Sequence, residues 1–67
     1  MSVSYNKLWK LLIDRNMSKA DLRKAAGVAA STFSRMNKSE YISLEVLVKI
    51  CVTLECKMDD VIDIIHD

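Results

Sequence analysis

A single glycine, Gly27, separates two short helical patterns in a chain of 67 residues that contains no proline. Ser18 can cap the first helix with its hydroxyl, and Asp21 places a negative charge near the positive helix end. A glycine that follows a short helix is typical of a C-terminal cap, because a positive φ angle costs least there. A second helix is expected over about 30–37. The stretch 18–39 therefore predicts two short helices joined by a tight turn.

The second helix of this pair is rich in hydroxyl groups. Phe33 and Met36 are expected to point inward, and the polar side chains outward. The outward positions are Ser31, Thr32, Ser34 and Arg35. Serine and threonine are mediocre helix formers, so packing alone explains this composition poorly. Such a helix fits the major groove of DNA, where arginine pairs with guanine and hydroxyls bond to several bases. An ordinary solvated helix face is the alternative that these residues leave open.

The length and composition predict one small domain, 1–67, that is all-α. One glycine, no proline and no alternating β-branched stretch favour helices throughout. No apolar run approaches the roughly 20 residues that a membrane span needs, and polar residues rather than a basic and apolar leader follow Met1. We therefore expect a soluble, cytoplasmic protein that makes no contact with a membrane.

The residue types that carry catalysis or bind metals are scarce. The chain has two cysteines, Cys51 and Cys56, and one histidine, His66. This spacing gives neither a disulfide framework nor a set of metal ligands, and buried free thiols are expected instead. There is no glycine-rich phosphate loop and no carboxylate pair facing an apolar pocket. We expect no metal, no cofactor, no small-molecule ligand and no enzymatic activity.

The formal net charge of +1 conceals a strong asymmetry. Residues 15–38 carry six basic side chains and one acidic side chain, whereas residues 39–67 carry two basic and seven acidic ones. The net charges of these segments are therefore +5 and −5. Such a division would orient the protein on DNA, with its basic half toward the phosphates. A charge run is more often a solvated face, but so complete a segregation is less usual.

Three further helices are predicted around the central pair. The first covers about 5–15, with Ser4 as its cap. Another follows Ser43, which can cap it, and runs over about 44–54. The last begins near Asp59, where acidic side chains suit the positive end of a helix. Its apolar residues would be Val61, Ile62, Ile64 and Ile65. The expected fold is a compact bundle of five helices.

Two of these helices carry more apolar surface than one core needs. Trp9 and Ile13 widen the apolar arc of the first helix, and Ile62 and Ile65 do so in the last. These four residues are candidates for a homodimer interface. Completion of the core within one chain is the alternative, and the sequence favours neither.

The order of these signals resembles one known family. The residues that carry the resemblance are Ser18, Leu22, Gly27, Val28, Ser31 to Arg35, Ser43, Leu44, Leu47, Ile50, Cys51 and Leu54. Together they resemble the phage-repressor-like helix-turn-helix family, also called the Cro or Xre type, over about 8–65. The resemblance implies a lambda-repressor-like DNA-binding domain whose third helix enters the major groove. It also implies binding as a homodimer, at least on DNA, to palindromic operators.

The resemblance assigns roles to individual residues. Positions that read bases fall on Ala30, Ser31 and Arg35, with Thr32 and Ser34 close by. Positions that contact phosphates fall on Lys19 and Lys38; we expect Ser18 to join them, and Arg23 as well if its side chain bends outward. Arg23 departs from the small residue that many relatives have there. Ala29 and Ala30 replace polar residues often found at the start of the recognition helix, and methyl groups can touch only a thymine methyl.

The family resemblance implies a sequence-specific transcriptional regulator, expected to be a repressor that also controls its own gene. The alternative is a helix-turn-helix protein-interaction module, such as an antitoxin or co-regulator, with weak or no DNA binding. Affinity for DNA distinguishes the two, because binding through phosphate contacts must weaken steeply with added salt.

Overall fold

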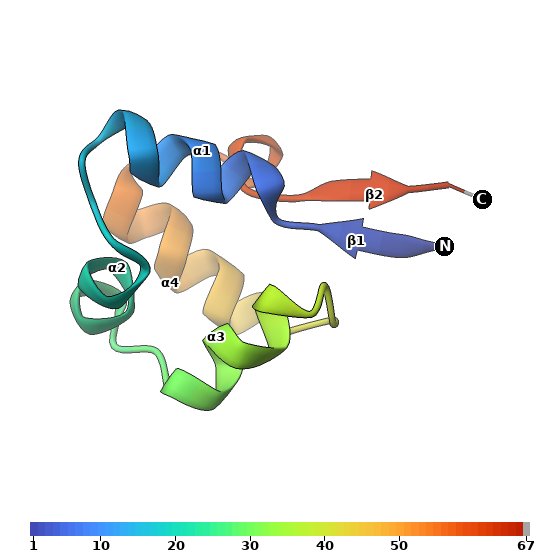
Figure 1. Cartoon of the computed structure of the whole chain (residues 1–67), viewed down its shortest axis with the longest axis horizontal. Coiled ribbons are helices and arrows are strands. Elements are labelled where there is room, and N and C mark those ends of the chain that lie inside the picture. The colour runs from blue at the N-terminus through green and yellow to red at the C-terminus, as the bar shows by residue number, and fades with distance from the viewer. Residues whose placement is uncertain (67) are drawn as a thin grey trace.

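The computed structural model describes residues 1–66. Within this range the chain folds into four α-helices, one turn of 3-10 helix and one pair of short strands (Figure 1). The elements in order are β1 (Ser2–Ser4), α1 (Asn6–Asp14), α2 (Lys19–Ala26), α3 (Ala30–Asn37), α4 (Leu44–Leu54), η1 (Met58–Asp60) and β2 (Asp63–Ile65). None of the helices in this part of the chain is long and apolar enough to cross a membrane.

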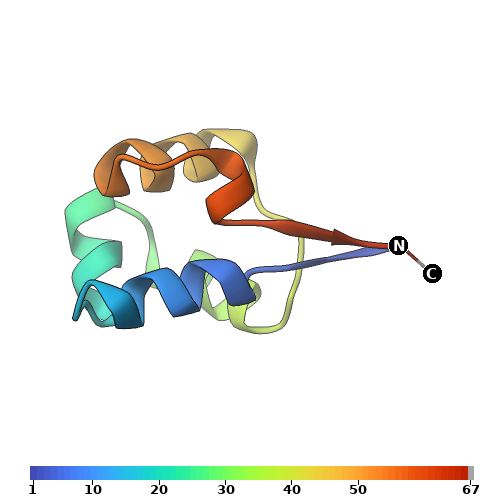
Figure 2. The same ribbon diagram turned by 90° about the horizontal axis from the view of Figure 1, so that it is seen from above.

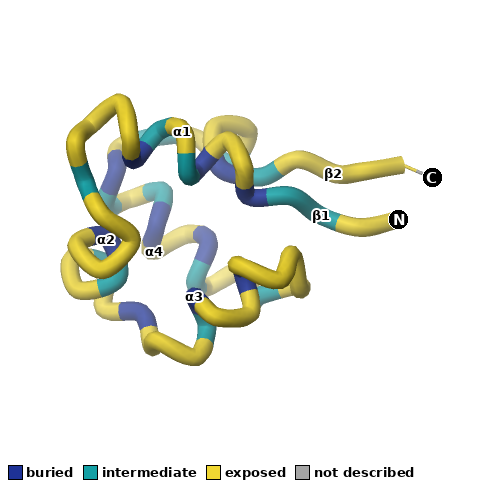
Figure 3. Tube along the Cα trace, in the orientation of Figure 1, coloured by how far each residue is buried: buried dark blue, intermediate teal, exposed yellow. Residues whose placement is uncertain are grey.

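The core lies between the four helices, each of which contributes apolar side chains at spacings of three or four residues. The buried apolar residues are Tyr5, Leu8, Leu12, Leu22, Val28, Phe33, Met36, Leu47, Ile50, Leu54 and Val61. The dark segments of Figure 3, which mark buried positions, occur on all four helices. This core holds α2 and α3 together and thereby fixes the surface that they present.

The helix pair predicted from 18–39 is confirmed. The Ser18 hydroxyl accepts a hydrogen bond from the backbone N–H of Asp21, and the Asp21 carboxylate accepts one from the backbone N–H of Ser18, each at 3.0 Å. This reciprocal capping box begins α2. Gly27 ends the helix in the left-handed conformation, with φ at 68°. Local signals therefore set both ends of α2.

The predicted caps of the flanking helices have different outcomes. Ser43 caps α4 as expected, because its hydroxyl accepts a hydrogen bond from the backbone N–H of Val46. At α1, Tyr5 rather than Ser4 occupies the cap position, although the Ser4 hydroxyl still accepts a hydrogen bond from the backbone N–H of Asn6 at 3.2 Å. The ring of Tyr5 is buried in the core, and its hydroxyl donates a hydrogen bond to the carbonyl oxygen of Glu40 at 2.7 Å. Burial raises the pKa of the Tyr5 hydroxyl.

The fifth helix was a wrong prediction, and the fold is mostly helical with a small two-stranded sheet rather than entirely α-helical. Residues 58–60 form a single 3-10 turn, and Asp63–Ile65 form the strand β2. It pairs antiparallel with β1, and Val3 lies opposite Ile64. Figure 2 shows the two strands extending together from the helical body. A short apolar run fits a helix or a strand equally well, and here pairing with a distant segment decides in favour of the strand.

Candidate nucleic-acid interface

The helix α3 presents one continuous exposed arc beside its buried side. Phe33 and Met36 are 5% and 1% exposed and fix the inward direction. At 100° per residue, the exposed positions cover an arc of about 160° on the opposite side. They are Asn37, Ala30, Ser34, Lys38, Ser31 and Arg35. Thr32 lies beyond this arc and is half-buried, so it is less well placed than its neighbours to reach a base.

A shallow depression of about 180 Å³ lies between α2 and α3. Its rim brings together four residues predicted from the sequence to bind DNA. They are Lys19, Arg23, Ala30 and Ser34. Arg23, the departure from the family pattern, is half-buried along this depression, while the preceding Leu22 remains fully buried. The larger side chain therefore leaves the packing of Leu22 intact and adds positive charge to the surface.

Lys19 connects the two helices of the pair. Its ammonium nitrogen donates to the side-chain oxygen of Asn37 at 2.7 Å and lies 4.1 Å from the centre of the Trp9 ring. The Trp9 ring packs in turn against Phe33, with the ring centres 6.2 Å apart. Asn37 was missed from the sequence, although its position seven residues after Ala30 places it on the same face. An asparagine amide can pair with adenine, so Asn37 joins the candidate interface.

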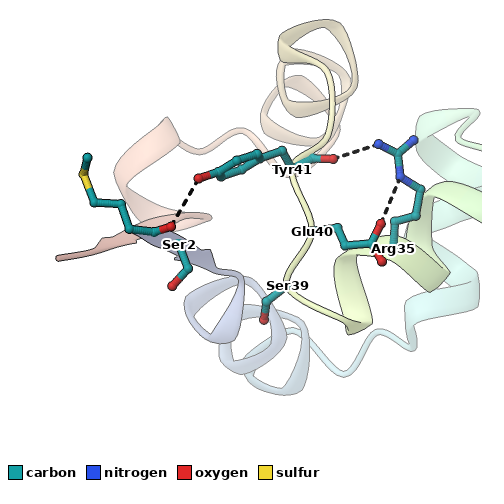
Figure 4. Close-up of a pocket in the computed structure, with 6 residues that line it drawn as sticks. Ser2, Arg35, Ser39, Glu40 and Tyr41 are labelled. Carbon is teal, nitrogen blue, oxygen red and sulfur yellow. Dashed lines mark hydrogen bonds and ion pairs between the residues drawn. The ribbon is translucent and has the colours of Figure 1, made fainter. Parts of the chain in front are cut away.

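Arg35 lies at the other end of the exposed arc and faces the loop after α3. Its guanidinium donates to the carbonyl oxygen of Tyr41 at 2.9 Å and lies 3.7 Å from a carboxylate oxygen of Glu40 (Figure 4). These residues and Ser39 line a second depression of about 480 Å³, which extends to the start of β1. The Arg35 side chain is therefore exposed to solvent, and its contacts with Tyr41 and Glu40 hold its guanidinium against the loop. Glu40 was also missed, because only the fold of the loop brings it to Arg35.

The remaining predicted phosphate contacts sit at helix ends. Ser18 and Lys38 are exposed, and Lys38 directly follows α3. The Ser18 hydroxyl already accepts the hydrogen bond that caps α2. Hydrogen bonds from the backbone N–H and hydroxyl of Ser18 hold the pKa of the Asp21 carboxyl below its usual range. Asp21 is therefore ionised at neutral pH. Its negative charge partly offsets the positive end of the α2 helix dipole.

Part of the negative charge of residues 39–67 lies away from the basic helix pair. Figure 1 shows α2 and α3 together on the side away from η1. The acidic residues Asp59 and Asp63 instead meet α1, where the Lys7 ammonium lies 3.1 Å from the Asp63 carboxylate and donates to the Asp59 carbonyl oxygen. Part of the charge division seen in the sequence is thus also a division in space, whereas Glu40 meets Arg35 beside α3.

The four residues predicted for a dimer interface have different surroundings. Ile13 is 72% exposed and Ile65 is 43% exposed. Trp9 and Ile62 are partly buried and pack against the core of their own chain. The structure therefore does not gather the four into one exposed patch, and dimerisation through them stays a prediction.

Comparison with known proteins places the chain among helix-turn-helix domains. The model of the Cro/C1-type helix-turn-helix DNA-binding domain matches residues 7–67. A crystal structure of the transcriptional regulator VanUg, in its form II, superposes with a TM-score of 0.94 at 53% sequence identity. The match covers 98% of this chain and 88% of that one. No curated protein sequence matches.

Proposed function

Because the chain belongs to the Cro/C1-type helix-turn-helix family, we propose that it is a sequence-specific DNA-binding transcriptional regulator. In this proposal α3 enters the major groove and α2 lies across the phosphate backbone. We propose further that the regulator is a cytoplasmic repressor, that it controls its own gene and that it binds DNA as a homodimer. The similarity to a transcriptional regulator over nearly the whole chain supports the assignment.

The observation that carries the proposal is the exposed arc of α3 beside the basic end of α2. Arg35 and Ser31 provide a guanidinium and a hydroxyl for base edges, whereas Lys19 and Arg23 provide positive charge for phosphates. Contacts with base edges carry sequence information, while contacts with phosphates fix the position of the protein. The two helices thus divide these tasks between them.

The test is fluorescence anisotropy of the purified protein with labelled DNA over a range of salt concentrations. The two duplexes are the DNA upstream of its own gene and a scrambled duplex of the same composition. We expect preference for the upstream DNA, with an affinity that falls steeply as salt rises. Equal and weak binding to both duplexes would reject autoregulation, and an absence of binding at low salt would reject the DNA-binding role.

One observation favours the protein-interaction module as a second candidate function. Leu44, Val48 and Val52 are exposed by 66%, 48% and 71% and follow one another at intervals of four residues along α4. This spacing places them on one face of the helix. An apolar stripe of this kind is typical of protein contacts. Loss of DNA binding at low salt, combined with normal folding, would favour this second function over the first.

A further inference from the structure

Three sulfur-containing side chains belong to the segment where α4 ends, outside the surface proposed to bind DNA. They belong to Cys51 in the last turn of α4, to Cys56 just after the helix, and to Met58 at the start of η1. The Cys51 thiol donates to the Met58 thioether, with the two sulfur atoms 3.7 Å apart. All three residues are half-buried, so the cluster is sheltered but accessible from solvent.

The backbone at the end of α4 places the two cysteines at positions whose side chains can touch. The N–H of Cys56 donates to the carbonyl oxygen of Cys51 at 3.0 Å, and the N–H of Glu55 donates to that of Val52 at 3.3 Å. Glu55 takes the left-handed conformation, with φ at 53°. This pair of hydrogen bonds defines a Schellman motif, in which the side chains at its first and last positions commonly touch. Here both of those positions are cysteines.

The two thiols also influence each other. Burial raises the pKa of the Cys51 thiol, and the neighbouring Cys56 raises that pKa further. The contact of Cys51 with Met58 then adds the third sulfur atom to the pair.

We propose that Cys51, Cys56 and Met58 form a binding site for a soft monovalent metal ion of the Cu(I) class. Thiolate and thioether sulfur are the protein ligands that select Cu(I). With metal–sulfur bonds of about 2.3 Å in a trigonal arrangement, the sulfur atoms would lie about 4 Å apart. The distance of 3.7 Å between Cys51 and Met58 is close to this requirement.

The chemistry of binding is an exchange of protons for metal. The two thiols release their protons to solvent, and each of the three sulfur atoms donates an electron pair to the ion, whose oxidation state does not change. Zinc fits less well, because structural zinc sites have four ligands. Within residues 1–66 no group of three or more His, Cys, Asp or Glu side chains is placed to hold a metal.

This site differs from the expectation drawn from the sequence. That expectation counted only cysteine and histidine as ligands, whereas the thioether of Met58 completes the set. Its ligands lie on α4 and on η1, so a bound ion would link these elements near the segment that leads to β2. A ligand that binds only the folded state stabilises it, and Cu(I) should therefore raise the melting temperature.

The test is an anaerobic titration in which the protein competes for Cu(I) with a coloured Cu(I) chelator. We expect one Cu(I) per chain, with a sulfur-to-copper absorption band in the ultraviolet. Cys51→Ser and Cys56→Ser should each weaken binding at least 100-fold, and Met58→Leu about tenfold. The matched control is Met17→Leu, because Met17 is half-buried between α1 and α2 and should leave affinity unchanged.

Three results would overturn the proposal. They are failure of the protein to take Cu(I) from the chelator, one ion per two chains, and equal affinities of the Met58→Leu and Met17→Leu variants. Circular dichroism of each variant without metal shows whether it is folded, and Met58→Leu remains decisive if a serine variant is not. Cu(I) affinity is measured without DNA, so its failure leaves the DNA-binding proposal untouched.

Discussion

Arg35 Nε lies 3.7 Å from Oε1 of Glu40, so the arginine proposed to read a base is paired with a carboxylate in the protein alone. Their side chains are 55% and 50% exposed, and ion pairs this exposed contribute little to stability. The pair can therefore open at small cost when DNA offers a guanine. Glu40 orients the arginine, and its negative charge opposes binding to the phosphate backbone.

This relationship predicts opposite effects for substitutions of its two members. Arg35→Ala should cost about 1–3 kcal/mol of binding free energy on the preferred DNA and reduce discrimination among sequences. Glu40→Gln should increase affinity for random DNA, because it removes a negative charge near the interface. Anisotropy titrations with specific and scrambled duplexes measure both effects. Equal losses on the two duplexes for Arg35→Ala would contradict its base-reading role.

Lys19 is expected to contact phosphate rather than a base. Lys19→Ala should weaken binding to all sequences and lower the slope of log affinity against log salt by about one. Lys10→Ala is the matched control, because Lys10 lies on α1 beside Asp14, Asp59 and Asp60. Lys19 also contacts Asn37 and Trp9, so the melting temperature of each variant must be recorded. A salt slope that falls equally in both variants would reject the assignment.

Phe33 anchors α3 to the core and is 5% exposed. Phe33→Ala should lower the free energy of unfolding by about 3–5 kcal/mol, because it leaves a cavity beneath the proposed recognition helix. Ser34→Ala, at the adjacent exposed position, should change stability by less than about 0.5 kcal/mol. Urea unfolding followed by circular dichroism measures both. Equal stability of the two variants would show that the ring contributes no core packing.

The capping box of α2 predicts a specific dependence of stability on pH. Ser18→Ala should cost about 1 kcal/mol of unfolding free energy, because the N–H of Asp21 loses its acceptor. The folded state lowers the pKa of Asp21, so the stability that its charge contributes is present above the unfolded-state pKa. That contribution is lost as pH falls through the folded-state pKa.

Asp21→Asn tests this dependence, because the amide does not titrate. The difference in unfolding free energy between the unmodified protein and the variant should shrink as pH falls from neutral into the acid range. Urea unfolding at a series of pH values measures this difference. A difference that stays constant with pH would mean that the Asp21 charge contributes nothing to the cap.

The left-handed residues that end α2 and α4, Gly27 and Glu55, predict opposite effects of substitution. Gly27→Ala should destabilise the fold by about 1 kcal/mol, although no atom lies within 4 Å of the added methyl carbon, because φ at 68° disfavours other residues. Glu55→Gly should stabilise the fold by about 0.5–1 kcal/mol, because φ at 53° strains a residue with a side chain. Thermal unfolding compares the variants. Destabilisation by Glu55→Gly would show that its side chain contributes more than the strain.

The sequence alone was sufficient to predict the four α-helices, because the signals that start, stop and orient them are local. Ser18 and Ser43 accept hydrogen bonds within three residues, and Gly27 relieves strain at one position. Apolar spacing then identified Phe33 and Met36 as the buried side of α3. The exposed face of that helix, and most of the candidate interface, followed from the same periodicity.

Tertiary structure decided the features that depend on residues far apart in the chain. The segment Asp63–Ile65 became a strand because β1, about 60 residues earlier, offers backbone hydrogen bonds. The fold also brought Asn37 to Lys19, which are 18 residues apart. Over shorter separations, the turns that follow α3 and α4 brought Glu40 to Arg35 and Met58 to Cys51. Capping and helical periodicity act within one turn and can be read from the sequence. Pairing of distant segments depends on the path of the whole chain, because backbone hydrogen bonding favours no particular partner strand.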